Sequence, residues 1–167
     1  MAVSSGTATV TLPTDEQILI TREFDAPRPL VWKAWTTPEL VRRWWSGGRG
    51  DLSVVEIDLR VGGSWRYVFT TERGFEVGFH GEYREIVPDE RLVATEVYEG
   101  AEAPPGIEPP VNTTEFTDTG DGRTVLTLLT DCHSKEVRDL IVQSGFESGM
   151  QDQMDLVEEI ARSLLTT

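Results

Sequence analysis

The hydrophobic pattern changes along the chain from a strand period to a helix period. Alternating positions from Gln17 to Phe24 predict a first strand. Later segments have strand-type composition and turn residues at both ends. There are six: Leu52–Leu59, Ser64–Thr70, Phe75–Ile86, Leu92–Tyr98, Val111–Thr117 and Thr124–Leu129. Strands that follow one another without alternating helices predict an antiparallel sheet rather than a doubly wound one.

Capping signals and helical spacing predict helices on both sides of this run of strands. Asp25 with Pro27, and then Thr37 with Pro38, indicate the starts of two short helices. After Cys132 the period becomes helical. We expect one helix from an N-cap at Ser134 to Gly145, and then a long amphipathic helix. Its apolar stripe comprises Phe146, Met150, Met154, Val157, Ile160, Ala161 and Leu164.

These elements predict an α+β fold. A curved, antiparallel, seven-stranded sheet wraps around the long C-terminal helix, and two short helices follow the first strand. Residues 1–14 are small, polar and without pattern, so we expect a flexible lead-in. Residues 15–167 then form a single domain. A sheet curled around a helix can enclose a space between the two.

Composition narrows the range of functions. The 167 residues include 29 acidic and 15 basic ones, a net charge of −14. This balance argues against nucleic acid and anionic membranes as partners, since both favour clustered Lys and Arg. The absence of a long apolar run or an export signal predicts a cytoplasmic protein. With two histidines and one cysteine we expect no metal site and no cofactor.

Aromatic residues carry the main indication of a binding site. Trp65, Tyr67 and Phe69 share one face of a predicted strand, and Phe79 and Tyr83 share a face of the next. An aromatic core is the simple alternative explanation. Rigid rings facing adaptable methionines are also typical of a small-molecule site. The candidate ligand-binding set is Trp44, Trp45, Trp65, Tyr67, Phe69, Phe79, Tyr83, Glu96, Phe146, Met150 and Met154.

Few polar residues of the predicted strands are candidates for chemistry. If Tyr67 and Phe79 point inward, His80 and Glu82 lie on the outer face. Glu96 lies between apolar neighbours on both sides, so its direction stays open, and an inward Glu96 would need a partner or a raised pKa. Cys132 and His133 are adjacent and project differently, which disfavours a catalytic dyad. We therefore assign no catalytic residue.

Four blocks of sequence resemble one known family. ITREFDAPRPLVWKAWTTPELVRRWW resembles the opening of the SRPBCC superfamily, in the branch named for the activator of the heat-shock protein 90 ATPase. DLRVGGSWRYVF matches that branch's Asp-x-Arg-x-Gly-Gly-x-aromatic signature. The blocks GFHGEYREIVPDERLVATEVYEG and RDLIVQSGFESGMQDQMDLVEEIARSL follow in the family's order. The resemblance extends from Ile18 to Leu165. It implies a helix-grip fold in which Asp58, Arg60, Gly62 and Gly63 define a turn.

The resemblance leaves the function open, because the superfamily includes carriers, receptors and enzymes. The first hypothesis is a non-enzymatic protein that encloses a small hydrophobic or aromatic ligand. The second is a cyclase or lyase-type enzyme acting on a polyketide-like substrate. A stress protein in contact with a chaperone comes third, and a homodimer is an open alternative. Several inward Glu, Arg or His groups would favour an enzyme, whereas Glu96 with tyrosine hydroxyls alone would favour a binding protein.

Overall fold

The computed structural model describes residues 7–100 and 105–166. Its strands are β1 (Thr9–Thr11), β2 (Gln17–Phe24), β3 (Gly50–Ile57), β4 (Ser64–Thr71), β5 (Glu76–Val87), β6 (Arg91–Thr95), β7 (Val97–Tyr98), β8 (Val111–Asp118) and β9 (Thr124–Asp131). Its helices are α1 (Arg28–Thr36), α2 (Pro38–Trp44), α3 (Lys135–Gln143) and α4 (Phe146–Ser163), with a 3-10 turn at Leu164–Thr166.

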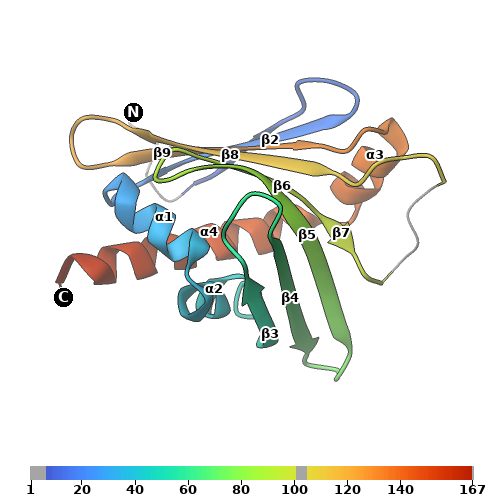
Figure 1. Cartoon of the computed structure of the whole chain (residues 1–167), viewed down its shortest axis with the longest axis horizontal. Helices are drawn as coiled ribbons and strands as arrows, with labels where there is room; N and C mark the ends of the chain where they lie inside the picture. The colour runs from blue at the N-terminus through green and yellow to red at the C-terminus, as the bar shows by residue number, and fades with distance from the viewer. Residues whose placement is uncertain (1–6, 101–104, 167) are drawn as a thin grey trace.

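The strands form one antiparallel sheet in the order β1-β2-β9-β8-β6-β5-β4-β3, and β7 pairs with β5. Helix α4 runs along one side of this bent sheet, as Figure 1 shows, and α1 and α2 pack against α4. Helix α3 lies at one end, where it follows β9. The predicted α+β helix-grip architecture is confirmed.

The sheet has nine strands in the described residues rather than the predicted seven. One additional strand arises because the predicted segment from Leu92 to Tyr98 is interrupted at Glu96. The backbone N–H of Glu96 donates to the carbonyl of Pro110, at 2.9 Å, and β7 resumes the pairing with β5 at Phe79 and His80. The seven predicted segments therefore all form strands, but one of them is split into two strands that both pair with β5.

The other additional strand, β1, comes from the segment expected to be a lead-in. Thr9, Val10 and Thr11 pair with the edge of β2, and Ala8 is buried. The side chain of Gln151 on α4 also bonds both backbone groups of Ala8. A three-residue strand is too short to produce a readable alternation. The segment 7–14 therefore differs from the expected patternless lead-in.

The helix starts agree with the sequence signals in part. Ser134 caps α3 as predicted, because its Oγ accepts the backbone N–H of Val137 at 3.3 Å. Asp25 was expected to cap the first helix, and that expectation is wrong. The N-cap of α1 is Pro27, and Asp25 instead donates its backbone N–H to Glu158 of α4. The Asp25 carboxylate lies 3.6 Å from Arg162 of α4, so both groups of Asp25 contact α4 and not the first turn of α1.

The bend of the sheet depends on Gly81 in β5. A Cβ atom at this position would lie 1.8 Å from the carbonyl oxygen of Thr95, so only glycine fits. The indole N–H of Trp65 donates to the same carbonyl at 3.1 Å. β5 and the end of β6 can therefore approach closely enough for the sheet to curve around α4.

A buried ion pair ties β2 to α4. The side chain of Arg22 is completely buried and donates to Asp155 at 2.9 Å and to Glu158 at 2.7 Å. Glu158 is only 14% exposed and also accepts the backbone N–H of Asp25.

The apolar stripe of α4 is buried, as predicted. Its buried residues are Met150, Met154, Val157, Ile160 and Ala161.

We expect Arg22→Met to lower the free energy of unfolding by on the order of 3 kcal/mol, because Glu158 then keeps its charge in a poorly solvated place without its cation. Urea denaturation would measure the loss. Arg28→Met is the matched control, since Arg28 is partly exposed, Glu90 is exposed and the two charged groups are 3.8 Å apart. That change should cost less than about 1 kcal/mol. Equal losses in the two variants would contradict this interpretation.

Candidate functional site

The inner face of β4 and β5 carries a cluster of aromatic rings. Trp45, at the end of α2, lies over this face and makes edge-to-face contacts with three rings. Its ring centroid is 5.3 Å from Tyr67, 5.9 Å from Phe69 and 5.1 Å from Phe79. Trp65 contacts Tyr67 at 4.8 Å. Sequence alternation predicted this common face, and the rings meet as expected.

Trp44 is separated from this cluster, although it adjoins Trp45 in the sequence. Its ring packs on Trp35 at 4.7 Å, and its indole N–H donates to the carbonyl of Ala34 at 2.8 Å. Trp44 therefore joins α1 to α2. Of these two candidate ligand-binding tryptophans, Trp45 is the one beside the inner aromatic face.

Helix α4 supplies the opposite side of this interior. Met150 and Met154 are buried on its inward stripe, and Phe146 is partly buried at its start. Gln153 holds Trp45 in position, because its side-chain amide donates to the backbone carbonyl of Trp45. The candidate residues of α4 therefore lie on the inward side of the helix, and Gln153 adds a contact that the sequence did not indicate.

A polar group interrupts the apolar inner face where β8 begins and β9 ends. Asn112 and Thr130 are paired across these strands, and the Thr130 hydroxyl donates to Asn112 Oδ1 at 2.7 Å. Glu96 is hydrogen-bonded to Asn112 as well. Burial raises the pKa of Glu96, and the bond to Asn112 opposes that rise. The inward orientation that the sequence left open is thus the observed one.

Two tyrosine hydroxyls complete this polar group. Tyr67 and Tyr83 are hydrogen-bonded to each other, and both side chains are buried. Burial raises the pKa of Tyr67 well above its ordinary value, and the nearby Tyr83 and Glu96 add to the rise. Burial likewise raises the pKa of Tyr83. Both phenols are therefore protonated at neutral pH and can donate or accept a hydrogen bond.

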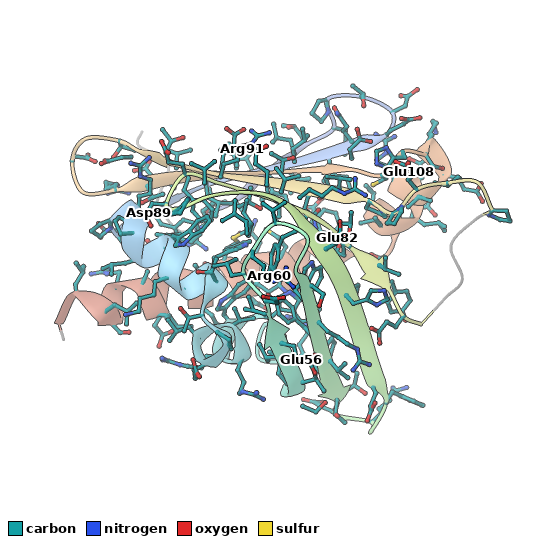
Figure 2. The ribbon with its side chains drawn as sticks, viewed as in Figure 1. Glu56, Arg60, Glu82, Asp89, Arg91 and Glu108 are labelled. Atoms are coloured by element: carbon teal, nitrogen blue, oxygen red, sulfur yellow. The ribbon has the colours of Figure 1, made fainter. Side chains whose placement is uncertain are left out.

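His80 and Glu82 lie on the outer face of β5, as predicted, and Figure 2 labels Glu82. His80 contacts Glu99 at 2.8 Å, and Arg66 donates two hydrogen bonds to the same carboxylate at 2.9 Å. The bonds from Arg66 and His80 lower the pKa of Glu99 to about 2. This cluster is exposed and separated from the inner face by the sheet itself.

Cys132 and His133 do not form a catalytic pair. Cys132 is fully buried, and burial together with Asp131 raises the pKa of its thiol to about 11. The thiolate required of a nucleophile is therefore disfavoured at neutral pH. His133 lies 3.5 Å from Asp131 and has a left-handed backbone, φ 57°. The described residues contain no group of three or more side chains suited to a metal ion.

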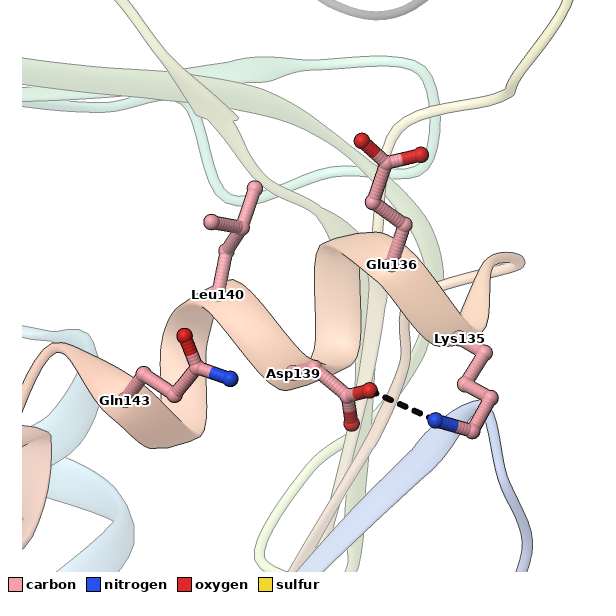
Figure 3. Close-up of a pocket in the computed structure, with 5 residues that line it drawn as sticks. All are labelled: Lys135, Glu136, Asp139, Leu140 and Gln143. Carbon is pink, nitrogen blue, oxygen red and sulfur yellow. Dashed lines mark hydrogen bonds and ion pairs between the residues drawn. The ribbon is translucent and has the colours of Figure 1, made fainter.

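An open groove of about 470 Å³ runs along α3, the helix that follows β9. Figure 3 shows Leu140 and Glu136 rising from one side of this helix, while Lys135 bonds Asp139 at 2.7 Å. Leu140 is 62% exposed, which is unusual for leucine on a helix that packs on a core. Gln143 continues the lining of this groove.

Contacts and backbone geometry at all four residues of the sequence signature shape the Asp58–Gly63 turn. Arg60, labelled in Figure 2, pairs with Asp58 at 2.9 Å. Gly62 has φ 84° and donates to the carbonyl of Tyr83, and a Cβ on Gly63 would lie 2.1 Å from the carbonyl oxygen of Asp58. The motif therefore shapes the connection from β3 to β4 and fastens it to β5.

Residues 25–162 match the family profile described as Activator of Hsp90 ATPase homolog 1-like protein. The chain belongs to this family. No curated protein matches the sequence significantly. Within residues 7–100 and 105–166, no helix has the length and apolar character needed to cross a membrane.

Solved bacterial structures share the fold of this family member. A protein from Rhodobacter sphaeroides has a TM-score of 0.84 at 22% identity, and the match covers 95% of this chain and 99% of that one. A protein from Nitrosomonas europaea has a TM-score of 0.81 at 25% identity, over 93% and 100%. A third, from Mycobacterium smegmatis, has a TM-score of 0.79 at 22% identity, over 92% and 96%.

The residues around Glu96 support a prediction about pH. A carboxyl with a raised pKa binds its proton more tightly in the folded state, so its ionisation lowers stability as pH rises from about 4.5. We expect Glu96→Gln to keep the Asn112 contact and to be more stable than the parent protein at pH 8, with the difference disappearing below about pH 4. Chemical denaturation at both pH values is the measurement. A loss of stability at pH 8 would contradict the raised pKa.

Proposed function

We propose that this protein binds a small, uncharged, apolar or aromatic molecule between the inner face of the sheet and α4. The observation that carries the proposal is the polar group of Glu96, Tyr67 and Tyr83 at one end of an otherwise aromatic and aliphatic interior. Sites for small molecules typically combine an apolar lining with a few polar groups that orient the ligand. The helix-grip family membership agrees with such a role.

The hydrogen-bonding capacity of these groups supports an uncharged ligand. The two phenols can each donate a hydrogen bond to a carbonyl or ether oxygen, and Glu96 can do so in its protonated form, which burial favours. An anionic ligand would lie close to a carboxyl group in a poorly solvated interior, at considerable electrostatic cost. The polar group would therefore select for a ligand with an accepting oxygen and no negative charge.

Trp45 is the side chain whose place an aromatic ligand would take. It is only partly buried, and the loop after it contains Gly47 and Gly48, both with positive φ. A ligand ring inserted between Tyr67 and Phe79 would replace the edge-to-face contacts that the indole makes now. The groove beside α3, with its exposed Leu140, is the proposed entrance.

The polar groups support a binding protein more than an enzyme. Glu96 is the carboxyl of the inner group, and burial favours its protonated form over the carboxylate that a general base requires. Neither histidine belongs to that group: His80 lies on the outer face, and His133 lies beside Asp131. A chaperone-linked role is a second candidate, supported by the family description alone.

Met154→Trp tests the proposal, because it adds a ring from α4 on the inward side. If the interior accommodates a ligand, we expect this variant to lose less than about 1 kcal/mol of stability, against about 1–3 kcal/mol for an overpacked core. It should also abolish the binding of N-phenyl-1-naphthylamine, a neutral aromatic probe whose fluorescence rises in apolar surroundings. Glu159→Trp adds the same ring to the exposed side of the helix and should leave probe binding unchanged.

The parent protein should bind the probe saturably and gain thermal stability from it, by about 2.7 kcal/mol at a hundredfold excess over the dissociation constant. Absence of both responses, together with an overpacking loss in Met154→Trp, would contradict the proposal and indicate a filled aromatic core.

A further inference from the structure

Most of the basic residues of this acidic chain form ion pairs with acidic side chains, but some do not. Of the fifteen, ten pair with an acidic side chain within 4.0 Å in the described part of the chain. The five without such a partner among the described residues are Lys33, Arg42, Arg43, Arg73 and Arg84. Arg42 and Arg43 are consecutive and occupy the last turn of α2.

Both of these arginines line one pocket of about 330 Å³ at the end of α2. The loop 46–50, which includes Arg49, forms its second side, and Glu72 from the β4–β5 turn forms the third. This pocket lies outside the aromatic interior. Three arginines therefore line one concave surface of a chain with a net charge of −14.

The three arginines differ in the hydrogen bonds and ion pairs that their guanidinium groups make. Arg42 donates to the carbonyl of Leu52 at 2.5 Å, which orients it and leaves its other N–H groups available. Arg49 also binds to α4: it forms an ion pair with Asp152 at 2.8 Å and donates a hydrogen bond to Ser148 at 3.2 Å. Arg43 is exposed and makes no side-chain hydrogen bond or ion pair to the described residues. Glu72 opposes them with one negative charge.

We propose that this pocket binds a doubly charged tetrahedral oxyanion, such as the phosphate group of a small molecule. Guanidinium groups form strong charge-assisted hydrogen bonds to phosphate oxygens, often two at a time. Arginines on different sides of a pocket fit an anion with several accepting oxygens better than a planar, singly charged carboxylate. The overall negative charge of the chain repels anions at a distance, so binding depends on these short contacts.

An NMR titration with inorganic phosphate at constant ionic strength tests this proposal on the intact protein. We expect saturable shifts in the backbone amide signals of Gly47, Gly48 and Gly50, and much weaker shifts with acetate. Arg43→Gln should weaken phosphate binding roughly tenfold, since it removes a charged donor without breaking a bond to the described residues. Glu72→Gln should strengthen binding, because it removes the opposing charge.

Arg84→Gln is the matched control. Arg84 is also exposed and without an acidic partner among the described residues, but it lies on β5, away from the pocket. An equal weakening in Arg84→Gln and Arg43→Gln would indicate general electrostatics and overturn the proposal. Shifts that do not saturate would also overturn it. Binding to vesicles that contain phosphatidic acid, without any response to inorganic phosphate, would likewise contradict a pocket for a free phosphate group.

Discussion

The curvature of the sheet requires a position without a side chain at Gly81. There, the Thr95 carbonyl of β6 comes so close to β5 that even a methyl group would overlap it. The same carbonyl accepts the Trp65 indole N–H, so the close approach also fixes the first ring of the aromatic face. Beyond this point the strand is interrupted at Glu96, and its two parts, β6 and β7, pair with different stretches of β5. The concave surface, the ring cluster and the inward carboxyl all follow from this local approach.

Much of the fold could be predicted because burial of one side imposes a period on the sequence. The alternation of Trp65, Tyr67 and Phe69 correctly identified an inward face, as did the helical stripe from Met150 to Ile160. Two features had no such signal. Glu96 stands among apolar residues on both sides, so alternation cannot reveal the break in the strand. The three residues of β1 are too few to define a period.

The candidate site was predictable only where its members share an element. Asn112, Thr130 and Gln153 were missed because ordinary polar residues acquire their roles through partners in distant elements. Asp25 illustrates the same limit. Its sequence context is that of a helix cap, but the carboxylate of Glu158 on α4 takes its backbone N–H. Local preference is overruled where partners in a distant element hold the residue instead.

The attachment of β2 has a consequence for how the protein is made. β2 pairs with β1 and with β9, and its buried Arg22 finds its carboxylates on α4, 133 and 136 residues further along the chain. During synthesis the first long strand therefore emerges from the ribosome well before its main partners exist. Contacts between such distant segments slow folding and leave strand edges exposed in the meantime. The nascent chain must keep a hydrophobic strand and an uncompensated arginine soluble until its last helix has been translated.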